Sequence, residues 1–389
     1  MPWLMPRLML WGSLLSTPYL AVAHHSAAPH YDMEKQISIA GVVSKFEFVN
    51  PHAYVYFIAL LDGQQQSWRC ELSARAFLDR MGWTANTFTV GQKVTFKGAP
   101  ARREEHVCML NSFVRADGME VDARANLLAG GVRQAAPLPL ATKVETKSDS
   151  AAATKAPSLS GYWVAQNQGG PGGGPGGGMG PGGPGGPGMG PGMGLEIRMG
   201  SGGMASFSAG GGGRPEASAA GVQAAKTYDQ RFDDPAIKCS AGNIIFGWTH
   251  DQNVNEIIQT DKSITLKYGY MDLMRTIHLD ATEHPKNLTP SLTGHSIGHW
   301  QGKELVVDTI GFKPGVLIPI GGLLHSEQLH IVERFSVDSA GTTLTRAYQV
   351  EDPLYLKASY SGSDVLLRSS EPYTPYNCVE LSGKNNQRS

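Results

Sequence analysis

Two histidines, His24 and His25, directly follow a short apolar segment at the N-terminus, where they could bind a metal ion. If the chain is cleaved after Ala23, His24 offers its α-amine and an imidazole nitrogen together as a chelating pair. A third nitrogen from His25, His30 or His52 would complete a ligand set that suits Cu(II). The amine must lose its proton to bind, and cleavage one residue earlier would remove the chelate. The alternative is a solvated terminus that binds nothing.

A second candidate site surrounds the phrase GHSIGHW, which contains His295. Asp308 follows within the apolar run LVVDTI, where a carboxylate needs a partner such as Arg275, His295 or Arg334. Inside a barrel, His295 and Asp308 would face a cavity and could act as acid and base or line a ligand site. The alternative is a buried structural network. The Gly-x-Ser-x-Gly form is not a hydrolase nucleophile elbow, because no helix is predicted after Gly298.

The phrase HSEQLH contains a His-x-Glu-x-x-His spacing that could bind a metal ion. In an extended segment, however, His325, Glu327 and Glu333 share one face of the strand. His330 then lies on the opposite face, so one ion could not reach both histidines. Ion pairs between Glu333 and neighbouring strands are the alternative to a functional role. We predict that the ligand-binding residues are Arg275, His325, Glu327 and Glu333.

These residues follow an N-terminal segment that reads as an export signal. Arg7 precedes an apolar stretch over residues 8–20, and Ala21-Val22-Ala23 fits the small-x-small pattern of signal peptidase sites. The stretch is too short for a transmembrane helix, and no later segment reaches spanning length. We expect that residues 1–23 are removed, that the protein is periplasmic or secreted, and that no membrane span remains. An uncleaved membrane anchor is the alternative.

Four cysteines, an even number, suit an oxidising compartment. None belongs to a Cys-x-x-Cys pair, so the sequence does not predict a zinc ribbon or a thioredoxin-type site. One disulfide per domain is the simplest of the three possible pairings, and free buried thiols are the alternative. The cysteines of the first domain are Cys70 and Cys108, and those of the second are Cys239 and Cys378.

The composition indicates a globular protein with an unusual internal segment. The chain has 389 residues and a net charge of −1, without the basic footprint typical of nucleic-acid-binding proteins. This length suggests two domains and additional segments. Residues 136–157 have the composition of a linker. Residues 169–213 contain 24 of the 48 glycines, and we predict a disordered insertion because so little apolar surface could be buried.

Both domains read as β-structure, so the predicted fold class is mainly all-β. Residues 24–135 show the order βββ-α-ββ of a five-stranded OB-like barrel, with a generic β-sandwich as the alternative. Residues 158–383 show eight or more short strands, which favour a closed antiparallel lipocalin-like barrel over an open sandwich. The strands expected in the first domain cover residues 37–48, 53–61, 66–72, 93–97 and 106–114, with a helix over 73–81.

The stretch HHSAAPHYDMEKQISIAGVVSKFEFVNPHAYVYF, which includes Asn50-Pro51-His52, resembles an uncharacterised bacterial family of exported domains. Its members begin the mature chain with His-His-Ser, and the resemblance continues through RMGWTANTFTVGQKVTFKGAPAR to cover most of residues 24–120. The second domain resembles another uncharacterised exported domain in the phrases FDDPAIKC, GHSIGHWQGKELVVDTIGF, HSEQLHIVERF and VEDP. The resemblance implies export and a β-rich fold but no activity. The glycine-rich block departs from the family pattern.

We therefore predict an exported accessory protein that binds a small molecule or a copper ion and has no catalysis of its own. The first alternative is an enzyme, a hydrolase, isomerase or hydratase, that uses His295 and Asp308 as acid and base. The second alternative is a scaffold with a protein partner in the cell envelope. Nucleic acid is not expected as a partner.

Overall fold

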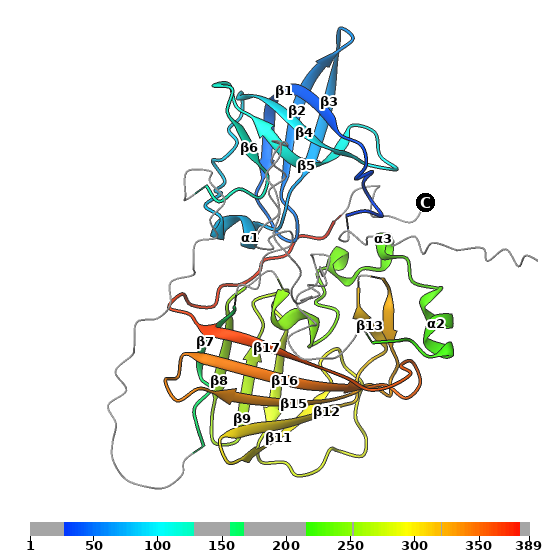
Figure 1. Cartoon of the computed structure of the whole chain (residues 1–389), viewed down its shortest axis with the longest axis vertical. Coiled ribbons are helices and arrows are strands. Elements are labelled where there is room, and N and C mark those ends of the chain that lie inside the picture. Colours follow the sequence, from blue (N-terminus) through cyan, green and yellow to red (C-terminus); the bar gives the residue numbers. More distant parts are fainter. Residues whose placement is uncertain (1–26, 128–155, 167–214, 251–252, 320, 382–389) are drawn as a thin grey trace, which may run out of the picture.

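The computed structural model describes residues 27–127, 156–166, 215–250, 253–319 and 321–381, which form two β-barrels (Figure 1). The predicted all-β class is confirmed. The export signal, the glycine-rich insertion 169–213 and nearly all of the predicted linker lie outside the described residues. No helix in the described ranges is long and apolar enough to cross a membrane.

The first barrel has the predicted OB-like strand order. Strands β1, β2 and β3 form an antiparallel meander, β4 and β5 pair on the other side of β1, and a parallel pairing between β3 and β5 closes the barrel. A short helix lies between the third and fourth strands, as predicted. The elements are β1 (Ile37–Glu47), β2 (Tyr54–Leu61), β3 (Gln64–Glu71), α1 (Arg75–Arg80), β4 (Lys93–Pro100), β5 (Val107–Val114) and the short β6 (Glu120–Asp122).

Alternating burial along the strands builds the core of this barrel. On β2, Val55, Phe57 and Ala59 are fully buried, whereas the residues between them are more exposed, because successive side chains point to opposite faces of a strand. The disulfide between Cys70 and Cys108 joins β3 to β5 at the closing pair. Aromatic rings fill the interior, among them Trp83, Phe88, Phe96 and Phe113.

The second barrel is a closed sheet of nine strands, so the predicted closure is confirmed. It differs from a simple meander at one place, where β10 and β11 are parallel because the connection between them crosses from one end of the barrel to the other. Its strands are β7 (Gly161–Ala165), β8 (Asn255–Gln259), β9 (Ser263–Lys267), β10 (Met274–His278), β11 (His295–Gln301), β12 (Glu304–Ile310), β15 (His330–Val337), β16 (Thr343–Glu351) and β17 (Tyr360–Arg368).

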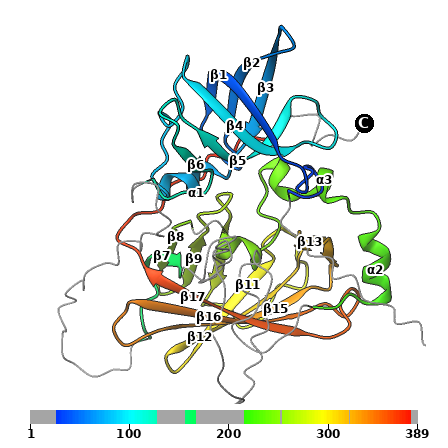
Figure 2. The ribbon, with the colours of Figure 1, turned by 45° about the horizontal axis from the view of Figure 1, so that its top comes forward.

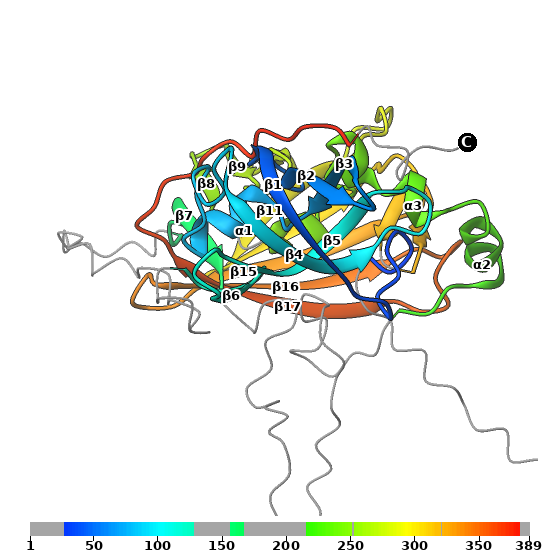
Figure 3. The same cartoon turned by 90° about the horizontal axis from the view of Figure 1, so that it is seen from above.

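Several shorter elements surround the second barrel. A separate hairpin of β13 (Gly315–Ile318) and β14 (Leu323–His325) lies close to α2 (Ala219–Ala225) (Figure 1). Figure 3 shows α2 at one side of the barrel. Two further short helices, α3 and η1, lead toward a 3-10 turn, η2, whose Trp248 is buried in the barrel core. Their bounds are α3 (Gln230–Asp233), η1 (Pro235–Lys238) and η2 (Phe246–Trp248).

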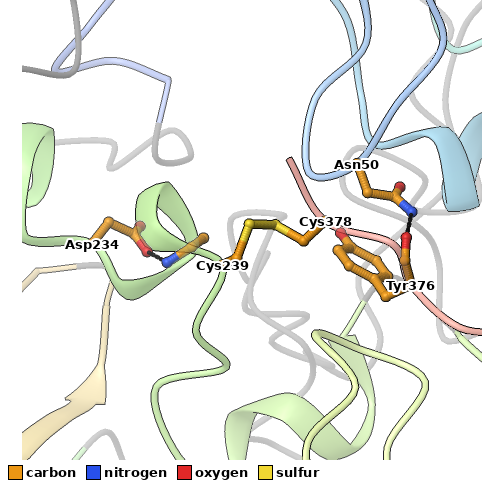
Figure 4. The surroundings of a disulfide bond; sticks show 6 residues. Asn50, Asp234, Cys239, Tyr376 and Cys378 are labelled. Carbon is orange, nitrogen blue, oxygen red and sulfur yellow. Dashed lines mark hydrogen bonds between the residues drawn. A yellow bond between two sulfur atoms is a disulfide. The ribbon is translucent and has the colours of Figure 1, made fainter. Parts of the chain in front are cut away.

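The C-terminal segment, residues 369–381, connects the two barrels. It leaves the last strand of the second barrel and runs to the first barrel (Figure 2). A disulfide joins its Cys378 to Cys239 after η1 (Figure 4). The cysteines therefore pair within each half of the chain, as the simplest prediction had it.

Candidate functional site

The first polar cluster lies at the beginning of the described chain, beside the five-stranded barrel. His52 follows the cis peptide bond between Asn50 and Pro51 and precedes β2. Its Nδ1 atom is 2.8 Å from Oε1 of Glu71, the last residue of β3. The hydroxyl of Tyr31 donates to Oε2 of the same carboxylate at 2.7 Å. Glu71 thus holds His52 and Tyr31 next to one another.

The electrostatics of this cluster favour an ionised Glu71. Burial disfavours the charged form of this carboxyl, but the charge and hydrogen bond of His52 and the hydrogen bond from Tyr31 lower its pKa to about 2. A carboxylate on Nδ1 fixes the tautomer and orientation of an imidazole and leaves Nε2 as the basic nitrogen. Histidines that bind metals commonly have this support.

The predicted copper ligands are only partly described. His24 and His25 lie outside the described residues, so the chelate at the mature terminus stays a prediction. Within the described ranges, no three His, Cys, Asp or Glu side chains are grouped so that they could hold a metal ion. His52, the third predicted ligand, is described, and Glu71 is the partner that the sequence did not reveal.

The predicted acid–base pair lies on the outer face of the second barrel, which corrects its expected place in a cavity. On β12, Val307 and Thr309 are fully buried, whereas the Asp308 side chain between them points outward and is 37% exposed. His295 does not contact Asp308 directly. His284 lies between them, with its Nδ1 2.8 Å from Nδ1 of His295 and its Nε2 2.8 Å from Oδ1 of Asp308.

A third histidine, His330, extends this outer cluster and also contacts Asp308. Nε2 of His330 lies 2.8 Å from Oδ2 of Asp308, and this hydrogen bond raises the pKa of His330 while it lowers the pKa of Asp308. In contrast to His330, the pKa of His295 is lowered, because of burial and the positive charges of the neighbouring His284 and His278. The cluster is therefore a chain of side chains rather than a pair. The cluster lies on the outer surface of the barrel. The expectation that His295 and Asp308 act as acid and base in an enclosed cavity is therefore not supported by their position.

The interior of the second barrel holds a buried network of charged side chains. Nη2 of Arg275, on β10, lies 2.9 and 2.7 Å from the two carboxylate oxygens of Glu333, on β15. Because β11 and β12 separate these strands in the sheet, the contact crosses the barrel interior. Nη1 of Arg346, on β16, lies 3.4 Å from the same carboxylate, and its guanidinium also pairs with Asp364. Burial disfavours the charged form of Arg346, but Asp364 and Glu333 outweigh it and raise its pKa.

The predicted ligand-binding set is divided by the structure. Arg275 and Glu333 meet, but His325 belongs to the separate β13–β14 hairpin, where its Nδ1 lies 3.0 Å from the carbonyl oxygen of Ser326. Burial lowers the pKa of His325. Glu327 is exposed in the turn that follows. The expectation that His325, Glu327 and Glu333 share one face of an extended segment is wrong, because a turn at residues 327–328 interrupts the segment.

The comparisons with known proteins bear on the first barrel. Residues 13–109 match the model of a family of unknown function, DUF6152. The N-terminal part of this chain therefore fits an uncharacterised family, as the resemblance implied. No curated protein matches the sequence. Among solved structures, a mutant of the fluorescent protein UnaG matches with 11% identity over 31% of this chain and 72% of its own, but the TM-score of 0.18 carries no argument.

Proposed function

We propose that the protein is an exported binding protein whose first domain holds one copper ion at the mature N-terminus. In this proposal His24 chelates the ion through its α-amine and one ring nitrogen, and His52 supplies a further nitrogen. The observation that carries it is the pair formed by His52 and Glu71, with 2.8 Å between Nδ1 and Oε1.

The position of the described N-terminus supports this assignment. The backbone N–H groups of His30 and Tyr31 donate to the carbonyl oxygen of Ala27 at 2.9 and 2.8 Å, and the side chain of Tyr31 is bound to Glu71. Ala27 is therefore tied to the cluster that contains His52. Only residues 24–26 precede it in a chain cleaved after residue 23, and three residues span at most about 10 Å.

The chemistry of the pair also suits a Cu(II) ligand. A carboxylate that accepts the Nδ1 proton makes Nε2 of an imidazole a better electron donor. Nitrogen ligands favour Cu(II), which is bound more tightly than the other divalent first-row metals. Two disulfides support an oxidising compartment, where cleavage of the export signal would expose the α-amine of His24.

The test uses protein that a bacterial host has exported and processed. Native mass spectrometry should give a mass that begins at His24 and one bound copper per chain after addition of Cu(II). His52→Ala should weaken copper binding at least tenfold in a competition titration. His299→Ala, an exposed histidine on the second barrel, is the matched control and should bind copper as the wild type does.

A chain with one extra residue before His24 provides the second test. It keeps every side chain but moves the α-amine away from the His24 imidazole, so copper affinity should fall. The copper proposal is overturned if the processed wild-type protein takes up no copper, or if His52→Ala binds copper as tightly as the wild type does.

A further inference from the structure

We propose that residues 279–294, which connect β10 to β11, form a strap that is docked on the second barrel at neutral pH and released at acid pH. The two strands are parallel, so the strap has to pass along the outside of the barrel from one end to the other. Between residues 280 and 290, all side chains except those of Ala281, His284 and Leu288 are exposed. Docking of the middle of the strap therefore depends on very few side chains.

His284 is the polar anchor of the strap. Its side chain is 14% exposed, and its Nδ1 lies 2.8 Å from Nδ1 of His295 on β11. Its Nε2 lies 2.8 Å from Oδ1 of Asp308 on β12. The apolar anchor is Leu288, which lies against Gly311 at the end of β12. Loss of the His284 contacts would leave Leu288 as the main attachment of the middle of the strap.

The two ends of the strap are held by backbone hydrogen bonds that do not involve His284. The N–H of Leu279 donates to the carbonyl oxygen of Lys262 at 2.8 Å. The N–H of Ser291 donates to the carbonyl oxygen of Gly311 at 3.1 Å. Release of the middle of the strap therefore does not require the barrel to unfold.

The proton count of the histidine contact makes it sensitive to acid. An ionised carboxylate only accepts hydrogen bonds, so Nε2 of His284 carries a proton toward Asp308. Of the two facing Nδ1 atoms of His284 and His295, one must donate and the other must accept. This arrangement tolerates one positive charge on the pair. A second charge places an N–H group on each side of the contact, and the hydrogen bond is then lost.

The groups around the pair increase this sensitivity. The ring of His278, at the end of β10, stacks on His295 with 5.0 Å between the ring centres, so its protonation adds a further positive charge. Burial and the two neighbouring histidines lower the pKa of His295. The other charged residues of the strap, Asp280, Glu283 and Lys286, are exposed. The titratable groups of the cluster come from the strap and five adjacent strands, and they are His278, His284, His295, Asp308, His330 and Glu351.

The direction of the pH effect follows from proton binding. A histidine whose pKa is lowered in the docked state binds fewer protons there than in the released state, so docking is favoured at high pH and is lost as pH falls. The loss starts near the ordinary histidine pKa of about 6.5. The lowered pKa of Asp308 keeps its carboxylate charged above about pH 4, and His330 occupies its other oxygen, Oδ2. Release is therefore expected between about pH 4 and 6.5.

Nitrogen-15 relaxation of the full mature chain, without added metal, measures the release. At about pH 7.5 the amides of residues 282–289 should have order parameters near 0.85, as in a rigid backbone. At about pH 4.5 they should fall below about 0.6, while the amides of β11 stay rigid. A strap that is equally rigid at both pH values refutes the proposal.

His295→Asn separates the charge of this residue from its hydrogen bond. The side-chain amide nitrogen of asparagine lies close to the position of a histidine Nδ1 and takes up no proton, so it can donate to His284 at either pH. The strap of this variant should stay rigid at about pH 4.5. His299→Asn is the matched control, because His299 lies on the same face of β11, is exposed and contacts Gln301. It should show the wild-type release, and the same release in His295→Asn would overturn the proposal.

His278→Gln changes only the charge beside the pair. The substitution leaves both contacts of His284 in place and removes a positive charge next to the His295 ring. The midpoint of the release should move to lower pH by about half a unit or more, because like charges at this distance repel. An unchanged midpoint would contradict the electrostatic origin of the switch. These results are independent of the copper proposal, because all of these histidines belong to the second barrel.

Discussion

Asn50 and Cys378 lie side by side in a parallel β-bridge, although they belong to opposite ends of the chain. The carbonyl oxygen of Asn50 accepts the N–H of Val379 at 2.7 Å. Its side-chain amide nitrogen donates to the carbonyl oxygen of Tyr376 (Figure 4). The amide oxygen accepts the backbone N–H of Ala76 at 2.9 Å. A single buried asparagine from the first barrel thus holds the C-terminal segment of the second.

Asn50→Ala should weaken this connection. The substitution leaves the carbonyl of Tyr376 and the N–H of Ala76 without their partners in a buried place, which should cost about 2–3 kcal/mol in the free energy of unfolding. Urea titration of the full chain measures the change. Asn86→Ala, an exposed position on the same barrel, is the control, and an equal midpoint for the two variants would contradict the role of Asn50.

Replacement of both Cys239 and Cys378 by serine should destabilise the second half of the protein strongly. The disulfide closes a loop with a sequence separation of 139 residues, and the chain-entropy model gives about 5 kcal/mol for a loop of this length. Calorimetry of the double variant should show a lower thermal midpoint than the wild type. An unchanged midpoint would mean that the other contacts of the C-terminal segment suffice.

Arg346→Met should be among the most damaging single substitutions. It leaves Asp364 without its cationic partner inside the barrel and also frees the carbonyl oxygens of Ile244 and Ile245, to which Arg346 donates at 3.1 and 3.2 Å. Breaking a buried ion pair in this way costs about 3–5 kcal/mol. Arg346→Lys should recover only part of the loss, because an ammonium cannot serve several planar acceptors at once.

Chemical denaturation of both Arg346 variants measures the free energy of unfolding. Arg334→Met is the matched control on the outer face of the same barrel, where Arg334 pairs with Glu304 and both side chains are exposed. Exposed pairs contribute about 1 kcal/mol or less. If Arg334→Met and Arg346→Met were equally damaging, the buried network would not have the stabilising role that its geometry indicates.

Asp308→Asn should change the titration of His330. The raised pKa of His330 means that its contribution to stability is present below its unfolded pKa of about 6.5 and is lost as pH rises through the folded value. The lowered pKa of Asp308 means that its contribution is present above about pH 4 and is lost as pH falls through the folded value. The ion pair is therefore strongest between about pH 4 and 6.5.

NMR titration of the imidazole signals checks this prediction. In Asp308→Asn the pKa of His330 should fall toward its ordinary value. The buried His325 is an internal control and should titrate alike in both proteins, because it lies on the separate hairpin. An unchanged His330 titration would show that Asp308 is not its main partner.

Local patterns in the sequence were sufficient to predict the strand order of the first barrel, the face of individual strand residues and the cysteine pairs. The order βββ-α-ββ predicted the first barrel. This was possible because the alternation of buried residues lies within one strand, and the turn residues lie between two consecutive strands. The period of a strand also placed Glu333 and His330 on opposite faces, and the structure confirms this: Glu333 is inside the barrel and His330 is on its outer face. The cysteines paired within each domain as their positions suggested.

Other features needed contacts between residues far apart in the chain. His284 reaches Asp308 from the connection between β10 and β11, a segment without periodicity that could predict its position. The turn after His325 removed that residue from the face it was expected to share with Glu333. Arg275 meets Glu333 only because the sheet closes and brings β10 and β15 to opposite walls of one interior.

The sequence by itself therefore determined the strand-rich class, the two β-barrels and the pairing of the cysteines within each half of the chain. Each of these depends on residue type and on spacing over a few positions. The tertiary structure alone decided that Glu71 supports His52, that Asp308 lies outside the barrel, and that Arg275 meets Glu333 inside it. The physical reason is that barrel closure and strand order set the distances between strands, and no local pattern encodes them.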